Sequence, residues 1–237
     1  MARLARVVVP GLPHHITQRG NGGSRVFFSD EDHALYVRLL TANCKLAKVD
    51  CWAFCLMPNH IHAILVPSDE DGLRKALAAT HRAYAGALNA RRKKTGHFWQ
   101  GRYGCAVMDE AHLTAAFRYI LRNPVAAKAV EKPEQWPWSS ARAYLKGADD
   151  GLTEKGPMLS RYPGMKALLG DEEPELDEHI ILRADETIGR PRGDARFIEK
   201  LERKTGRSLK AGKRGPKPGL KRAAKKARTA RKVRKGN

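Results

Sequence analysis

Apolar residues follow two different spacings along the first 125 residues. Stretches in which apolar side chains alternate with polar ones, or follow each other without a break, predict strands. Between these stretches, leucine and other apolar residues recur every three or four positions, which predicts amphipathic helices. The predicted strands are residues 14–19, 49–56, 60–66 and 105–108.

The first two predicted helices have acidic starts. One begins at Ser29, which is followed by three acidic residues, and it continues to Leu46. The other begins at Ser68 and ends in the basic run 91–94, where Gly96 is expected to cap it. Each helix has one apolar face, so each is expected to cover a sheet.

The third predicted helix begins at Asp109 and is expected to end at Pro124. At about 100° per residue, Tyr119 falls off its apolar stripe, and Asn123 lies one turn further on the same side. We therefore expect Tyr119 to be turned away from the core and available for chemistry, although a solvent-facing tyrosine without a role would show the same pattern. The stripe itself consists of Leu113, Phe117, Ile120 and Leu121.

The order of elements predicts the fold. The first six form the βαββαβ series of a ferredoxin-like α+β fold, an antiparallel sheet backed by helices, with the third helix appended. Glycine, proline and acidic residues are frequent after residue 146. We expect one domain over residues 1–145, an accessory region of short helices over 146–205, and a partly disordered basic C-terminal extension over 206–237.

The positive charge of the chain is concentrated at its C-terminal end. Of 45 Lys and Arg residues, fourteen lie in residues 206–237, which contain no Asp or Glu. The net charge of +20 therefore falls to +6 over the first 205 residues. Such a tail is a solvated terminus that favours nucleic acid as a partner. Gly189-Arg190-Pro191 resembles segments that enter narrow minor grooves, although a plain linker explains it as well.

The cysteines and the hydropathy indicate a reducing compartment. No Cys-x-x-Cys occurs, so neither a zinc knuckle nor a redox pair is expected. Cys51 and Cys55 have the same strand parity and are expected to be reduced core residues on one face. No signal peptide and no membrane span are recognised, so we expect a cytoplasmic, nucleoid-associated protein.

Candidate chemistry centres on the strand at residues 60–66. Side chains two apart on a strand point to the same face, so His60 and His62 can bind one metal ion. His14 and His15 are adjacent on the first strand and face opposite sides, so at most one of them lines the same site. The alternative for each of these histidines is a structural position.

Two loops have compositions suited to nucleic acid. A glycine-rich loop that follows Arg19 contains Asn21 and is compatible with phosphate binding. Phe98, Trp99 and Arg102 combine aromatic rings with a cation, as surfaces that stack bases do. An aromatic core strand is the alternative for this second stretch.

Several motifs together resemble one protein family. They are HITQRGN at 15–21, CLMPNHIH at 55–62, GHFWQGR at 96–102, RYILRNP at 118–124 and WPWSS at 136–140. In this order they look like the single-tyrosine HUH transposases of bacterial insertion sequences, and most like the branch associated with repetitive extragenic palindromes (REPs). The resemblance covers about residues 3–145, and the stretches at 189–191 and 206–207 are similar to the C-terminal extension of that branch.

The resemblance implies a metal-dependent reaction on DNA. His60 and His62 would be ligands of Mg²⁺ or Mn²⁺, and Tyr119 would be the nucleophile that forms a 5′-phosphotyrosine. Asn123 stands where the family commonly has a glutamine as the third ligand. The implied substrate is single-stranded or hairpin DNA. The protein is expected to act as a monomer or a homodimer, and no membrane partner is expected. Expected DNA contacts are Arg19, Asn21, Phe98, Trp99, Arg102, Arg118, Arg190 and Arg214.

Three other functions remain open at this point. His60, His62 and a third histidine would suit a zinc hydrolase, which would tolerate the loss of Tyr119. A domesticated, catalytically idle protein would use the fold and the tail only to hold DNA. A basic RNA-associated protein with two core histidines is the third alternative.

Overall fold

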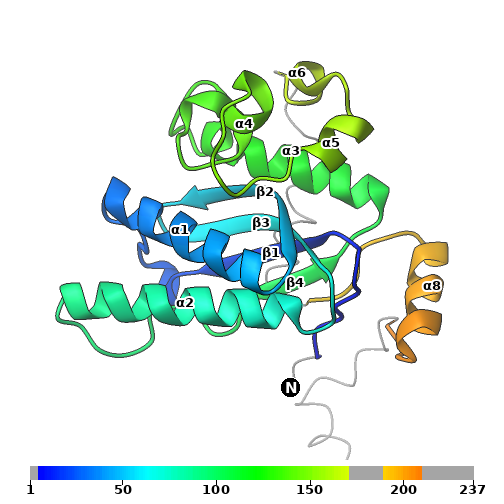
Figure 1. The fold of residues 1–237 in the computed structure, drawn as a ribbon, viewed down its shortest axis with the longest axis horizontal. Helices are drawn as coiled ribbons and strands as arrows, with labels where there is room; N and C mark the ends of the chain where they lie inside the picture. The colour runs from blue at the N-terminus through cyan, green and yellow to red at the C-terminus, as the bar shows by residue number, and fades with distance from the viewer. Residues whose placement is uncertain (1–4, 171–188, 210–237) are drawn as a thin grey trace, which may run out of the picture. The chain divides into compact units, whose positions relative to one another are not determined.

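The computed structural model describes residues 5–170 and 189–209 of the chain. In these residues, four strands form one antiparallel sheet in the order β2-β3-β1-β4 (Figure 1). This is the strand order of a ferredoxin-like βαββαβ unit, so the predicted α+β fold is confirmed. The strands are β1 (His14–Arg19), β2 (Val49–Met57), β3 (His60–Pro67) and β4 (Gly104–Val107).

Helices cover both faces of the sheet, and each face has its own core. On β3, Ile61, Ala63 and Leu65 belong to the core beneath α1 (Asp30–Leu46) and α2 (Gly72–Arg91). Ile64 and Val66 belong to the core beneath α3 (Glu110–Ala126). Figure 1 shows α1 and α2 on one side of the sheet and α3 on the other. Three short helices complete the α3 side, namely α4 (Ala141–Lys146), α5 (Gly156–Arg161) and α6 (Met165–Leu168).

Both outer strands of the sheet are hydrogen bonded to a later part of the chain. On the β2 side, the amide of Leu56 donates to Trp138 O (2.8 Å) and that of Ser140 donates to Phe54 O (3.0 Å). On the β4 side, the amide of Arg192 donates to Val107 O (2.7 Å) and that of Asp109 donates to Arg192 O (2.9 Å). The chain then enters α8 (Ala195–Thr205), whose first turn is capped by Asp194.

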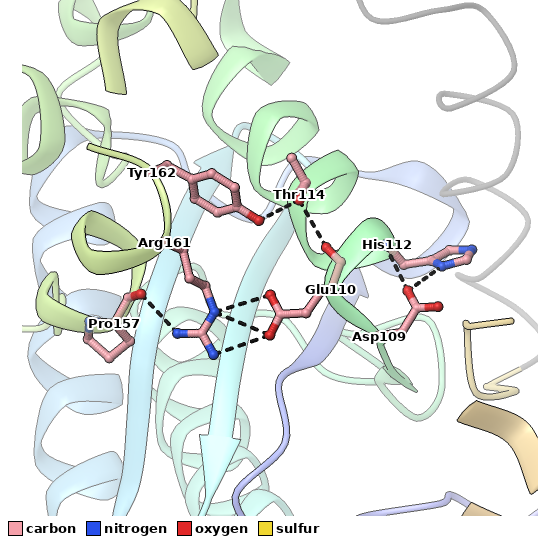
Figure 2. Close-up of polar contacts among 7 residues, drawn as sticks. All are labelled: Asp109, Glu110, His112, Thr114, Pro157, Arg161 and Tyr162. Atoms are coloured by element: carbon pink, nitrogen blue, oxygen red, sulfur yellow. Dashed lines mark hydrogen bonds and ion pairs between the residues drawn. The ribbon is translucent and has the colours of Figure 1, made fainter. Parts of the chain in front are cut away.

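Polar contacts attach α5 to the start of α3 (Figure 2). The Arg161 guanidinium donates to the Glu110 carboxylate, with Nε to Oε2 at 3.1 Å. The hydroxyls of Thr114 and Tyr162 are hydrogen bonded to each other. These contacts, together with the apolar residues of the shared core, hold the short helices against α3.

The described residues up to Arg207 belong to one compact unit. The expected division into residues 1–145, 146–205 and 206–237 stays a prediction. No helix among the described residues is both long enough and apolar enough to span a bilayer.

Two predicted helix ends were wrong. The third helix was expected to stop at Pro124, but α3 continues to Ala126 because a proline in the last turn removes only one hydrogen-bond donor. The second helix was expected to reach a cap at Gly96. It ends at Arg91 instead, and Lys93 takes the left-handed conformation (φ 50°) that turns the chain.

The predicted shared face of Cys51 and Cys55 was also wrong. Between Cys51 and Ala53 the register of β2 against β3 shifts by one residue, which is a β-bulge. The bulge reverses the alternation, so Cys51 lies in the α1–α2 core and Cys55 in the α3 core. Both cysteines are free and buried, as expected.

Candidate functional site

The two candidate histidines lie at the start of β3, directly after the β2–β3 turn. The antiparallel register places His60 opposite Arg19 and His62 opposite Thr17 of β1. Their residue parity is that of Ile64, so both face the side of the sheet covered by α3. Their ring centroids are 5.0 Å apart, with the planes at 85°. The two imidazoles are therefore neighbours on one face, as the spacing predicts.

Each of these imidazoles is held through its Nδ1 atom. His60 Nδ1 is 2.6 Å from Asn59 Oδ1, and His62 Nδ1 is 3.1 Å from His15 Nε2. Histidines that bind metals commonly donate their second ring N–H to such a partner, which fixes the ring and the tautomer. In this arrangement Nε2 would be the ligating nitrogen of both rings. The residues present therefore fit a divalent cation.

His15 is a third imidazole beside this pair. Its ring stacks on that of His62, with centroids 5.3 Å apart and planes at 17°. It is 1% exposed, and burial lowers its pKa to about 4, with the positive charge of Arg192 adding to the effect. His15 is thus a neutral imidazole at pH 7. Of the two adjacent histidines of β1, His15 lines the site, whereas His14 Nε2 accepts a hydrogen bond from the Val9 amide (3.1 Å) on the other side.

Tyr119 meets the histidines from α3. Its ring stands edge-on to His62, with centroids 5.2 Å apart and planes at 87°. The prediction that Tyr119 is turned away from the core was wrong, because its side chain is 3% exposed and belongs to the α3-side core. The reason is that α3 packs between the sheet and the later short helices, so residues beyond its main apolar stripe are buried too.

The neighbours of Tyr119 on α3 are also largely covered. Asn123 is 8% exposed and lies one turn after Tyr119, so its role as a metal ligand stays a prediction. Arg118 is half-buried and stays a predicted DNA contact. Arg122 has a structural role, since its guanidinium donates to Leu169 O (2.9 Å) and Gly170 O at the end of α6.

The hydrolase alternative requires a zinc site with three protein ligands. Among the described residues, no group of three or more His, Cys, Asp or Glu side chains is arranged to hold a metal ion. Within that part of the chain, a metal site at His60 and His62 would need an amide, water or substrate as its further ligands.

The two predicted DNA-binding loops, at residues 20–23 and 96–102, are hydrogen bonded to each other and to the end of β1, opposite His60. The Asn21 amide donates to Phe98 O (3.0 Å), and the Gln100 amide donates to Arg19 O (2.8 Å). A groove of about 510 Å³ opens between the loop at residues 96–102 and α2. Its lining combines aromatic rings, cations and small residues, among them Phe98, Trp99, Arg82, Arg102, Ala85 and Gly86.

The predicted DNA contacts in the two loops, at residues 20–23 and 96–102, differ in exposure. Trp99 is half-buried, and its Nε1 donates to His81 O (3.0 Å), so it supports the fold whatever else it does. Phe98 is half-buried and packs on the same core, whereas Arg102 and Asn21 are exposed. The stretch is a loop with one isolated bridge rather than a strand.

The remaining predicted DNA contacts lie elsewhere. Arg19 is half-buried at the end of β1. Arg190 is half-buried in the segment that runs beside β4, and Arg214 lies outside the described residues. The DNA-binding assignments of all these residues stay predictions.

Sequence analysis did not identify Asn59 and Arg192 as neighbours of this site. Asn59 was included only as part of the CLMPNHIH motif, although an amide directly before a candidate ligand is a signal for a supporting contact. Arg192 reaches the neighbourhood of His15 only because its segment returns to β4, and no local pattern reports such a long-range pairing.

Comparison with known proteins finds a family match in the first half of the chain. Residues 12–123, which contain β1 to β4 and most of α3, match the family model of IS200-like transposases. Over these residues, the predicted resemblance to the tyrosine transposases of insertion sequences is confirmed. The match includes His60, His62, Tyr119 and Asn123.

One relative has a matching assignment. The chain is 26% identical over 114 residues to a Haemophilus influenzae (strain ATCC 51907 / DSM 11121 / KW20 / Rd) protein assigned as a REP-associated tyrosine transposase. That alignment covers 44% of this chain and 65% of the relative, so the chain spans slightly less than two thirds of the relative's length.

One solved structure shows the same fold. A REP-associated tyrosine transposase bound to a REP hairpin superposes with a TM-score of 0.50 at 18% identity, covering 65% of this chain and 90% of that one. A Deinococcus radiodurans R1 protein assigned as a transposase gives a TM-score of 0.36 at 19% identity, covering 52% and 97%.

Proposed function

We propose that this protein is a metal-dependent transposase that cleaves and rejoins single-stranded DNA next to a hairpin, with Tyr119 as the nucleophile. The observation that carries the proposal is the 5.2 Å contact between the rings of Tyr119 and His62, which unites the third helix with the histidine pair of β3. The family match supports the class of reaction. The REP hairpin in the structural neighbour supports the class of substrate.

In the proposed step, the phenolic oxygen of Tyr119 attacks the phosphorus of a phosphodiester. The Tyr119–phosphorus bond forms as the bond from phosphorus to the 3′ oxygen breaks, giving a 5′-phosphotyrosine and a free 3′-OH. The proton lost by the phenol is balanced by the one that the 3′ oxygen gains. The reverse reaction with another 3′-OH rejoins DNA without an external energy source, because the ester keeps the phosphodiester bond energy.

The histidine pair serves the phosphate in this proposal. His60 and His62, with Asn123 one turn after Tyr119 on α3, would hold Mg²⁺ or Mn²⁺. When bound, the cation withdraws charge from the scissile phosphate and stabilises the departing oxygen. The contribution of the chain is to fix the two rings through Asn59 and His15, so that both Nε2 atoms keep their positions as substrate enters.

Access of DNA requires a local rearrangement. A phosphate does not fit between two rings whose centroids are 5.2 Å apart, and the Tyr119 side chain is only 3% exposed. We infer that substrate binding displaces the Tyr119 side chain or shifts α3 relative to the sheet.

A denaturing gel tests the proposal. Wild-type protein incubated with labelled hairpin DNA and Mn²⁺ should give a covalent adduct, and neither Tyr119→Phe nor His60→Ala should give one. Both variants should still bind the hairpin in a native gel. An adduct that survives in Tyr119→Phe would overturn the assigned nucleophile. Hairpin binding by the wild type without any adduct would support the catalytically idle DNA-binding alternative instead.

A further inference from the structure

His15 contacts one of the two candidate metal ligands directly. The buried rings of His15 and His62 stack, and a 3.1 Å hydrogen bond joins His15 Nε2 to His62 Nδ1. The register of β1 against β3 fixes this relationship, because His62 pairs with Thr17, two residues further along the His15 face of β1. Two strands of the central sheet therefore hold the contact in place.

The hydrogen bond has a direction that metal binding decides. A neutral imidazole carries one N–H and one lone pair, so a ring that binds a cation through Nε2 must carry its proton on Nδ1. His62 Nδ1–H then donates to the lone pair of His15 Nε2. With the opposite direction, the proton of His62 would sit on Nε2 and would block ligation.

From this geometry we propose that His15 is a positioning residue for the metal site, acting as the hydrogen-bond acceptor that holds His62 in its Nδ1–H tautomer. This inference rests on the proposed function, since it concerns the same candidate metal site. His15 itself would not be a ligand. Its role parallels that of Asn59, whose Oδ1 is 2.6 Å from Nδ1 of His60, so each ligand has its own supporting acceptor.

The two acceptors differ in rigidity. Asn59 is half-buried in a turn and directly precedes His60, the ligand that it supports. His15 is 1% exposed and lies on a separate strand, paired on one side with β3 and on the other with β4. We therefore expect the loss of the His15 acceptor to weaken metal binding by about 10- to 100-fold, as removal of supporting residues usually does.

The choice of variants follows from the atoms involved. His15→Phe keeps a planar ring of similar size that can stack on His62, but it removes the acceptor. His15→Gln places an amide oxygen close to where Nε2 was, so it should recover most of the lost affinity. His14→Phe is the matched control, because His14 is equally buried on the same strand and points to the other side.

Isothermal titration of the full-length protein with Mn²⁺ alone is the first measurement. Wild type and His14→Phe should bind equally, His15→Phe about 10- to 100-fold more weakly, and His15→Gln in between. Far-UV circular dichroism without metal should show all four proteins folded. A folded His15→Phe that binds Mn²⁺ as wild type does would overturn the proposal, and so would a loss that His15→Gln fails to restore.

A second measurement needs no variant. Long-range ¹⁵N–¹H spectra of the Mg²⁺-bound wild type should report His62 with its proton on Nδ1. A proton on Nε2 would overturn the proposal even if no variant folds.

The two proposals fail separately. If the wild type forms the Tyr119 adduct while His15→Phe binds Mn²⁺ normally, only the role of His15 falls. If the wild type binds no Mn²⁺ and forms no adduct, the proposed function falls, and the role of His15 falls with it.

Discussion

The ring of Tyr119 stands edge-on to the imidazole of His62, at a centroid distance of 5.2 Å and with the planes at 87°. The same tyrosine is 3% exposed within the core on the α3 side of the sheet. One side chain therefore serves both the packing of α3 and the proposed chemistry. The two roles can be separated, because the ring serves the packing and the hydroxyl serves the reaction.

Tyr119→Phe and Tyr119→Ala should therefore differ in stability. Phenylalanine keeps the buried ring, so we expect the free energy of unfolding to change by about 1 kcal/mol or less. Alanine leaves a cavity and should cost about 3–5 kcal/mol. Urea unfolding followed by circular dichroism measures both. Equal destabilisation by the two substitutions would mean that the hydroxyl, rather than the ring, holds Tyr119 in place.

The groove between α2 and the loop at residues 96–102 should bind an unpaired base. Phe98→Ala should weaken binding of single-stranded DNA by about 1–3 kcal/mol, because one stacking surface is lost. Fluorescence anisotropy with a labelled oligonucleotide measures the effect. Leu46→Ala, at an exposed apolar position at the end of α1, is the control and should bind as wild type does. Unchanged binding by Phe98→Ala would assign Phe98 to packing alone.

Arg102 should contribute through phosphate rather than through stacking. It is exposed at the rim of the same groove. Arg102→Ala should therefore make the negative slope of log K against log salt shallower by about 1, the value for one phosphate contact. Lys45→Ala removes an exposed cation from the end of α1 and should leave the slope unchanged. Binding measured between low and high salt decides it. The same slope in both variants would exclude a phosphate contact by Arg102.

Removal of residues 210–237 should flatten the salt dependence much further. This segment contains thirteen Lys and Arg residues, Arg214 among them, and each one that contacts phosphate adds about 0.7–0.9 to the slope. The cut leaves Arg207 in place, whose guanidinium donates to Arg6 O (2.9 Å) within the compact unit. The adduct assay should still show cleavage at low salt. An unchanged slope would show that the tail does not bind DNA.

The ion pair between Asp32 and Arg91 should make stability depend on pH. Burial of the Asp32 carboxyl by itself raises its pKa, but hydrogen bonds from Arg91 and the Phe28 amide and the charge of Arg91 lower it overall. A lowered folded pKa stabilises the protein above the unfolded value of about 4, and this stabilisation is lost as pH falls through the folded pKa.

Arg91→Met should therefore reduce stability most above pH 4. Below that, protonation of Asp32 removes the advantage of the wild type, and the two melting temperatures should converge. Thermal unfolding across the acidic range measures this. Arg92→Met is the control, because Arg92 stacks over the Phe28 ring and does not pair with Asp32. A gap between Arg91→Met and wild type that stays constant down to pH 2 would contradict the assigned ion pair.

The sequence predicted the elements and the sheet because their spacing is local. Periodicity identified the four strands, the three long helices and the parity that places His60 and His62 together. It could not identify the β-bulge at residues 51–53, since one inserted residue leaves the apolar pattern of a buried strand unchanged. The shared-face prediction for the two cysteines failed for that reason.

The details of the site depended on contacts that the sequence does not report. Strand parity indicated that at most one of His14 and His15 would line the site, and only the contacts made across β1 and β3 show that His15 does. The burial of Tyr119 follows from the packing of later short helices on α3, and helical spacing describes only one face of a helix.

The hydrogen bonds along the two outer strands have a further consequence. An open outer strand offers unpaired N–H and C=O groups to any other extended chain, which is a common route to aggregation. Trp138 to Ser140 occupy part of this row on β2, and Arg192 occupies part of it on β4. The segments that follow the family-matched region thus shield a sheet that would otherwise be free to associate side by side with other copies, and a protein shortened to residues 12–123 should precipitate more readily than the full chain.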